Sequence, residues 1–236
     1  MTKAPVSASQ VSGSPHYLGH RERLRERLKT AGGDSLADYE MLELILFRAI
    51  PRRDVKPLAK ALLARFGSFP EVVAARPERL KEIEGISEAA IVEMKIVYEA
   101  AKRFAKTVVR DRHVLASFSA VFDYCRTAMA FLDHEEFRIL FLDKKNVLIA
   151  DEVQGVGTID HAPVYPREIM RRALELNATA MVLVHNHPSG DPNPSGPDIQ
   201  MTREIVTLGK SLNVLVHDHL IIGREGITSF KGLQLI

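Results

Sequence analysis

Two histidines and an aspartate stand at spacings that suit a metal ion. His185 and His187 follow directly from the apolar run ATAMVLV, and ten residues separate His187 from Asp198. Side chains at positions i and i+2 of an extended chain point the same way, so both imidazoles can converge on one point. Four prolines in the intervening loop stiffen the return of the chain to Asp198. Two imidazoles and one carboxylate leave a fourth position for water, which distinguishes catalytic zinc from closed structural zinc.

The same segment also has an ordinary structural explanation. Ser195 and Asp198 form the Ser-x-x-Asp pattern of a helix capping box, with Asp198 near the positive end of the following helix. A loop rich in Pro and Gly can be a simple surface turn. The histidine pair favours a metal, because two imidazoles on one face at the end of an apolar strand need partners. A cap and a ligand role are compatible, since capping would fix the orientation of the carboxylate.

A second histidine-rich position, His217-Asp218-His219, lies on a later apolar run. Asp218 would face away from the two histidines, so these three residues do not suit a metal cluster. We expect instead that Asp218 or His219 packs behind the metal site and orients its ligands.

Composition predicts a globular protein without a membrane span. The 236 residues are 46% hydrophobic and 26% charged, the usual balance for such proteins. No apolar run reaches the roughly 18 residues that a membrane helix needs, and the Ser- and Pro-rich start lacks the apolar core of a secretory signal. The single cysteine, Cys125, excludes an internal disulfide and fits a reducing cytoplasm. It is expected to be a small core residue.

The pattern of elements predicts an α+β fold with α/β-like layers in two domains. The first part carries helical patterns over 20–31, 38–47, 54–67, 77–85 and about 87–105, with a short turn region before Pro77 and Asp54 as an expected N-cap. The second part alternates β-rich runs (137–143, 147–154, 178–184, 214–223) with helices at 166–177 and 195–213. We therefore predict a disordered tail at 1–16, a helical domain at 17–108 and a mixed sheet flanked by helices at 114–236.

Charge is unevenly distributed between these parts. Residues 1–112 carry 21 Lys and Arg against 15 Asp and Glu, whereas residues 113–236 carry 11 against 15. A basic first half could meet nucleic acid or another acidic partner, and a solvated surface explains the imbalance equally well.

The metal segment resembles the JAMM signature His-x-His-Pro-x6-Ser-x2-Asp, read here at 185, 187, 188, 195 and 198. HNHPSGDPNPS with DHLIIG downstream resembles the RadC family in particular. This resemblance implies the JAB1/MPN fold, which is cytidine-deaminase-like, with one zinc ion on His185, His187 and Asp198. It also implies that Ser195 donates a hydrogen bond to a tetrahedral oxyanion.

The resemblance further implies a glutamate on an early strand that acts as general base through water. Glu135 and Glu136 are the candidates in HEEFRILFLD, and only one can face the site, because neighbours on a strand point to opposite faces. We favour Glu135. Asn186 stands where deubiquitinating relatives usually have Ser or Thr, which leaves the ligands intact and puts the substrate class in doubt.

The first half is similar to a helix-hairpin-helix element at Leu80–Ser87. In such elements a glycine hairpin presents backbone N–H groups to a DNA phosphate without reading sequence. Gly85, Ile86 and Ser87 would form that hairpin, although Ser87 replaces the usual second glycine and can equally be a helix N-cap. The flanking segments again resemble the RadC N-terminal region, so the resemblance runs from Gly19 onward.

Two functions follow from these observations. The leading hypothesis is a zinc-dependent hydrolase, a metallopeptidase of JAMM type, that cleaves a peptide, isopeptide or other amide bond of an unknown protein or peptide. The competing hypothesis is a DNA-associated repair or recombination accessory protein, bound through its basic N-terminal domain, whose metal site is structural or vestigial. Sequence alone leaves the substrate and the oligomeric state open.

Overall fold

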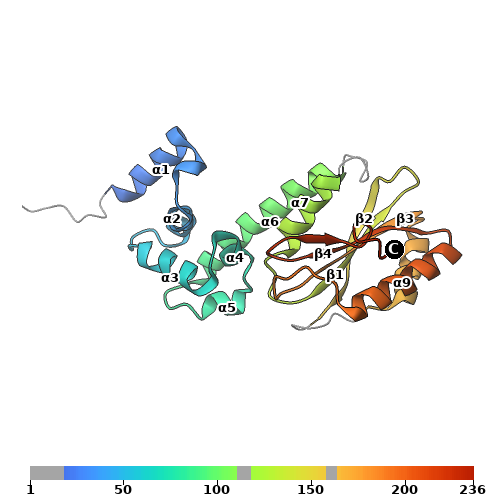
Figure 1. Ribbon diagram of the computed structural model, residues 1–236. Helices are drawn as coiled ribbons and strands as arrows, with labels where there is room; N and C mark the ends of the chain where they lie inside the picture. The colour runs from blue at the N-terminus through green and yellow to red at the C-terminus, as the bar shows by residue number, and fades with distance from the viewer. Residues whose placement is uncertain (1–18, 111–117, 158–163) are drawn as a thin grey trace, which may run out of the picture.

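The computed structural model describes residues 19–110, 118–157 and 164–236, and Figure 1 shows a group of helices joined to a helix-covered sheet. The helices are α1 (His20–Ala31), α2 (Asp38–Ala49), α3 (Lys56–Phe66), α4 (Phe69–Ala74), α5 (Pro77–Lys81), α6 (Glu88–Arg110), α7 (Phe118–Met129), α8 (Pro166–Glu175) and α9 (Gly196–Ser211), with a 3-10 turn at Gly33–Ser35. The strands are β1 (Glu136–Leu142), β2 (Leu148–Val156), β3 (Ala180–Asn186), β4 (Leu215–Ile222) and β5 (Ile227–Ser229).

The first six helices share one apolar core. Leu24 from α1, Leu46 from α2, Leu62 from α3 and Met94 from α6 are almost fully buried in it. Each comes from an amphipathic pattern in which apolar residues recur every three or four positions. The short connections between these helices therefore fold them back on one another.

Helix α6 connects this helical core to the sheet. Its first half lies in the helical core, whereas Val109 belongs to the core on the sheet. The buried hydroxyl of Tyr98 donates a hydrogen bond to the backbone oxygen of Ala128 in α7, at 2.8 Å. The helix runs to Arg110, five residues beyond the predicted end, so it enters the region where the domain boundary was predicted.

The five strands form one mixed sheet in the order β2-β1-β3-β4-β5. Strand β3 is central: it pairs antiparallel with β1 and parallel with β4, and all seven of its residues are buried. The predicted β-rich runs at 137–143 and 147–154 overlap the antiparallel pair β1 and β2, and the apolar run at 178–184 overlaps β3. The parallel pair places the ends of β3 and β4 side by side.

Helices cover both faces of the sheet. Val182 and Val184 of β3 belong to the core under α7, whereas Met181 and Leu183 belong to the core under α8 and α9. This alternation follows from the two-residue period of a strand. Cys125 is fully buried in α7, where burial raises the pKa of its thiol to about 12, as befits a packing residue.

Several local expectations need correction. Helix α3 begins at Lys56 with Val55 as N-cap, so Asp54 is not the cap; its carboxylate accepts the N–H of Lys56 instead. The segment expected to be a turn before Pro77 contains α4, which Ser68 caps. Strand β5 was not predicted, because three residues give too short a pattern. The predicted tail at 1–16 lies outside the described residues.

The predicted fold class is confirmed: a helical N-terminal region precedes a mixed five-stranded sheet with flanking helices. Within the described residues, no helix has both the length and the apolar character needed to span a bilayer.

Candidate metal centre

His185, His187 and Asp198 converge at one end of the sheet and could hold a metal ion. His185 lies in β3, His187 follows that strand directly, and Asp198 lies in the first turn of α9. The two Nε2 atoms are 3.0 Å apart, and they lie 3.4 Å and 3.6 Å from the nearest carboxylate oxygens of Asp198. Zinc bonds of about 2.0–2.1 Å in a tetrahedron place neighbouring ligand atoms about 3.3 Å apart. The three separations therefore fit one tetrahedral ion.

A chain of hydrogen bonds fixes the tautomer of His185. The hydroxyl of Thr202 donates its only proton to the backbone oxygen of Asp198, at 2.6 Å. It must therefore accept from Nδ1 of His219, also 2.6 Å away. Nε2 of His219 then accepts the Nδ1 proton of His185, at 2.8 Å. The free lone pair of His185 is thus on Nε2, which faces the site.

His219 suits this role because it is buried and neutral. It has no exposed surface, and burial holds the pKa of its imidazole well below the ordinary value. A neutral imidazole has one donor and one acceptor nitrogen, and here both are used. His219 therefore fixes the tautomer of His185, and as a neutral imidazole it adds no positive charge beside the candidate metal ligands.

His187 is fixed in the same tautomer by the loop that follows it. Its Nδ1 donates to the backbone oxygen of Asp191, at 2.8 Å, which leaves the lone pair on Nε2. Two Nε2 lone pairs then face each other across 3.0 Å, next to a carboxylate. Such an arrangement is unfavourable unless a cation or a proton lies between them. The three donor atoms could thus hold a metal ion between them.

The pKa shifts of His187 and Asp198 also favour a positive charge between the three candidate ligands. The carboxylate of Asp198, which would accept from a protonated His187, raises the pKa of His187 against the effect of burial. Burial opposes ionisation of Asp198, but His185 and His187 outweigh it and hold the pKa of this carboxyl below its ordinary range. The site therefore keeps a carboxylate ionised in a largely enclosed position.

Ser195 and Asp198 form the capping box that the sequence suggested as an alternative. Ser195 is the N-cap of α9, and its backbone N–H donates to Oδ2 of Asp198 at 2.8 Å. The hydroxyl of Ser195 also donates to Oδ2, at 2.5 Å. Capping thus orients the carboxylate of Asp198 toward the histidines, so the structural role and the ligand geometry coincide in one residue.

Glu135 lies in a cavity of about 490 Å³ together with His187, Ser195 and Asp198. It immediately precedes β1 and is only 9% exposed. Glu136 points elsewhere: its carboxylate accepts from the guanidinium of Arg138, at 2.6 Å. Only Glu135 of the two candidates shares the cavity with His187 and Asp198.

Asn186 holds the segment that carries Glu135, a role that the sequence did not indicate. This side chain is 1% exposed, and its oxygen accepts the backbone N–H of Glu136 at 2.9 Å. Its amide nitrogen donates to the backbone oxygen of His134, at 2.8 Å. Both residues that flank Glu135 are therefore tied to a residue between the two histidine ligands. A side chain that pairs with two backbone groups is visible only in the folded chain.

Gly223 was also missed, and it supports the ligand loop. A Cβ atom at this position would lie 2.1 Å from the backbone oxygen of Gly190, which no side chain tolerates. Next to it, the guanidinium of Arg224 donates to the backbone oxygen of Pro188, at 2.5 Å. The turn between β4 and β5 therefore packs backbone to backbone against the loop that follows His187.

The helical region forms one wall of the cavity at the metal centre. Arg79 of α5 lines it, and Arg76 forms an ion pair with Asp133 at 2.6 Å. A second ion pair joins Glu71 of α4 to Arg224, at 3.0 Å. The site is thus assembled from both halves of the chain.

The remaining predicted residues lie away from the ligands. The carboxylate of Asp218 accepts from the hydroxyl of Ser229 at 2.5 Å and from the backbone N–H of Lys231 at 2.9 Å, so it secures the turn after β5. The hairpin at Gly85, Ile86 and Ser87 joins α5 to α6, and the hydroxyl of Ser87 accepts the N–H of Ala90 at 3.2 Å. Ser87 is therefore a helix cap in this hairpin.

Two regions of the chain match known protein families. Residues 115–235 match the RadC-like JAB domain, which is the part of the chain that contains the metal centre. Residues 16–92 match the UPF0758 N-terminal domain, which is the helical part. The chain belongs to the RadC family, as its sequence motifs suggested.

Proposed function

We propose that this protein is a zinc-dependent hydrolase that cleaves a peptide, isopeptide or other amide bond. The observation that supports it best is the position of Glu135, a buried carboxylate in the same cavity as His187 and Asp198. A closed structural site would need four protein ligands and no such carboxylate.

The division of roles follows from the contacts of each side chain. A zinc ion on His185, His187 and Asp198 would supply Lewis-acid activation of water and of a carbonyl group. Glu135 would accept the proton of the attacking water and deliver it to the leaving nitrogen. Asn186 would hold Glu135 in place through the two flanking backbone groups.

Ser195 would stabilise the developing oxyanion. Its hydroxyl lines the cavity, but its proton is directed to Asp198. The hydroxyl would have to rotate from the carboxylate toward the substrate during the reaction. Replacement of an oxyanion donor typically costs about 10²–10³ in kcat.

The competing function is a DNA-associated protein with a structural metal. The two functions differ in what they expect of Glu135, because a structural site does not use it. The test is hydrolysis of a library of peptides and Nε-peptidyl-lysine isopeptides by zinc-loaded protein, with new termini identified by mass spectrometry. We expect cleavage by the wild type and loss of at least about 10² in rate for Glu135→Gln at unchanged zinc content. Equal product from both proteins, or none from either, would contradict the proposal.

A further inference from the structure

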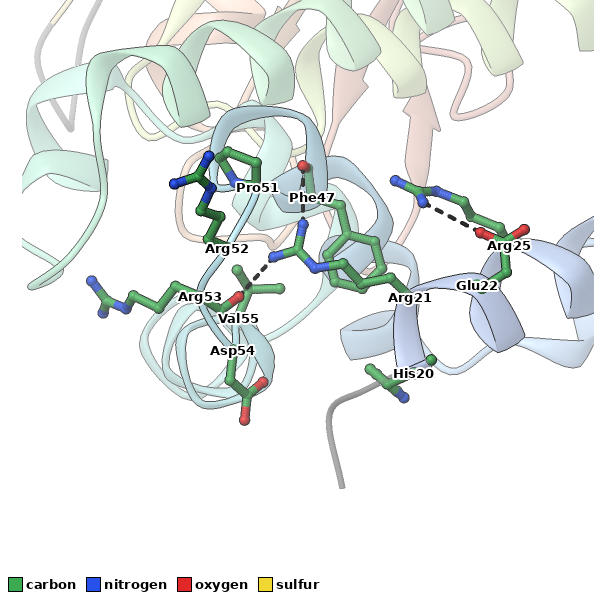
Figure 2. A pocket seen from close by; sticks show the side chains of 11 residues that line it. His20, Arg21, Glu22, Arg25, Phe47, Pro51, Arg52, Arg53, Asp54 and Val55 are labelled. Carbon is green, nitrogen blue, oxygen red and sulfur yellow. Dashed lines mark hydrogen bonds and ion pairs between the residues drawn. The ribbon is translucent and has the colours of Figure 1, made fainter. Parts of the chain in front are cut away.

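A second cavity, of about 370 Å³, lies in the helical part and shares no residue with the metal centre. Figure 2 shows it between the start of α1 and the loop at residues 50–55. Its walls include Arg21 and Arg25 from α1 and Arg52 and Arg53 from the loop, and the described lining residues add two carboxylates, Glu22 and Asp54. Positive charge therefore predominates around the cavity.

Most of this charge is not neutralised by the protein. Within the described part of the chain, the guanidinium groups of Arg52 and Arg53 take part in no ion pair or hydrogen bond, and both residues are exposed. The guanidinium of Arg25 lies 5.8 Å from the centre of the Phe47 ring, and it forms a long ion pair with Glu22, at 3.7 Å, with both side chains largely exposed. Such pairs contribute about 0–1 kcal/mol, so they yield readily to a better anion.

Arg21 organises the cavity. Its guanidinium lies over the buried ring of Phe47, 4.4 Å from the ring centre, and donates to the backbone oxygens of Ile50 at 2.5 Å and Arg53 at 2.7 Å. These acceptors are neutral, so the positive charge of Arg21 remains. Burial and the adjacent Arg25 lower the pKa of Arg21, while Asp54 and Glu43 act in the opposite direction. The same bonds fix the loop that presents Arg52 and Arg53.

The cavity adjoins the hairpin between α5 and α6. A Cβ atom at Gly85 would lie 2.7 Å from the guanidinium of Arg53, so these two groups are in contact range. Gly85 has a φ of 89°, and it leaves the space that Arg53 occupies. Arg53 thus reaches from the loop to the hairpin, where the exposed Glu84 precedes Gly85.

The side chains that line the cavity indicate the chemical class of its ligand. Planar guanidinium groups bind phosphate through paired hydrogen bonds, which makes arginine the usual partner of phosphodiesters. Among the described residues that line the cavity there is no Asn, Gln, Ser or Thr side chain to hydrogen-bond a base edge, and the ring of Phe47 is buried beneath Arg21. A mononucleotide would need such a base pocket. Binding of a nucleic-acid strand requires only contacts to a series of its backbone phosphates. Several separate arginines can make these contacts.

We propose that this arginine-lined cavity binds backbone phosphates of a nucleic acid without reading its sequence. Arg52 and Arg53 contact the phosphates, and Arg21 positions the loop. The proposal is independent of hydrolysis at the metal centre.

The experiment is fluorescence anisotropy of a short labelled DNA duplex, and of its single strand, titrated with the full-length protein between about 50 and 200 mM salt. The variant is Arg52→Gln/Arg53→Gln. The control is Arg167→Gln/Arg203→Gln, which removes the same charge at two exposed positions of α8 and α9. All four residues are exposed, and thermal unfolding verifies that the variants fold.

We expect the wild type and the control to bind with similar affinity. The Arg52→Gln/Arg53→Gln variant should bind at least about tenfold more weakly, and its slope of log K against log salt should be smaller by about 2. Absence of DNA binding by the wild type at low salt, or equal losses in variant and control, would overturn the proposal. Calorimetry measures binding of inorganic phosphate to the same protein. Phosphate binding without DNA binding would indicate a site for a free anion, and it would overturn the nucleic-acid assignment.

Discussion

His219 lies directly behind His185, with its Nε2 2.8 Å from Nδ1 of the ligand. The two residues are 34 positions apart, and the parallel pairing of β3 with β4 brings them together. This contact determines which nitrogen of His185 is free for a metal. The metal centre thus depends on a buried residue that would not touch the ion.

Loss of His219 should therefore weaken zinc binding. We expect His219→Leu to raise the zinc dissociation constant by about 10–100-fold, because His185 loses the acceptor that orients it. His219→Gln, which keeps an acceptor and a donor, should retain more affinity. Chelator competition measures both. His217→Leu is the control, because His217 contacts Asn146 rather than a ligand; equal affinity of His219→Leu and wild type would refute the role.

Asn186 offers a test of how Glu135 is positioned. Asn186→Leu leaves the N–H of Glu136 and the C=O of His134 buried without partners, which should lower the free energy of unfolding by about 1–3 kcal/mol for each group. Zinc content should stay at the wild-type level, while hydrolysis falls. Urea unfolding and metal analysis measure the two effects. A variant that loses zinc as fully as a ligand mutant would show that Asn186 acts on the ligands instead.

Gly223 should be intolerant of any side chain. In Gly223→Ala the new methyl group would collide with the backbone oxygen of Gly190, so the loop after His187 must move. We expect a lower melting temperature and weaker zinc binding, because that loop also supplies the acceptor for His187. Gly226→Ala is the control, since its Cβ would lie 3.9 Å from Pro192 in ordinary contact. Similar behaviour of the two variants would contradict this explanation.

Asp151 should make the stability of the fold depend on pH in the acid range. Burial opposes its ionisation, but Arg138, Lys106 and Tyr124 outweigh it and lower the pKa of the Asp151 carboxyl. A carboxyl with a lowered folded-state pKa stabilises the fold above its unfolded pKa, about 3.9, and this contribution is lost as pH falls through the folded value. We expect the stability difference between wild type and Asp151→Asn to be full at pH 7 and to narrow below about pH 4. Urea unfolding across this range measures it, and a constant difference would contradict the prediction.

The ligand residues could be predicted because their geometry is local. His185 and His187 belong to one extended segment, and Asp198 opens the next helix, so strand periodicity and the capping pattern suffice. The fold class was predictable for a similar reason, since long helices and buried strands have clear periods. The weakest predictions concerned short elements such as α4 and β5 and the far end of α6.

The residues that complete the site depend on tertiary pairing. Thr202 and His219 meet His185 only after α9 and β4 have packed beside β3. Gly223 matters only because another loop approaches it. In the sequence, Asn186 stands out only as a departure from deubiquitinating relatives. No sequence period encodes such contacts, because each joins separate segments of the chain.

The most direct test of the metal centre is the zinc content of the purified and zinc-reconstituted protein, measured by atomic emission after removal of free metal. We predict one zinc ion per chain for the wild type and for His217→Ala. We predict less than about a tenth of this amount for His185→Ala, His187→Ala and Asp198→Ala, because two remaining ligands do not hold zinc firmly. Wild-type protein without zinc, or ligand variants with unchanged zinc content, would contradict the account.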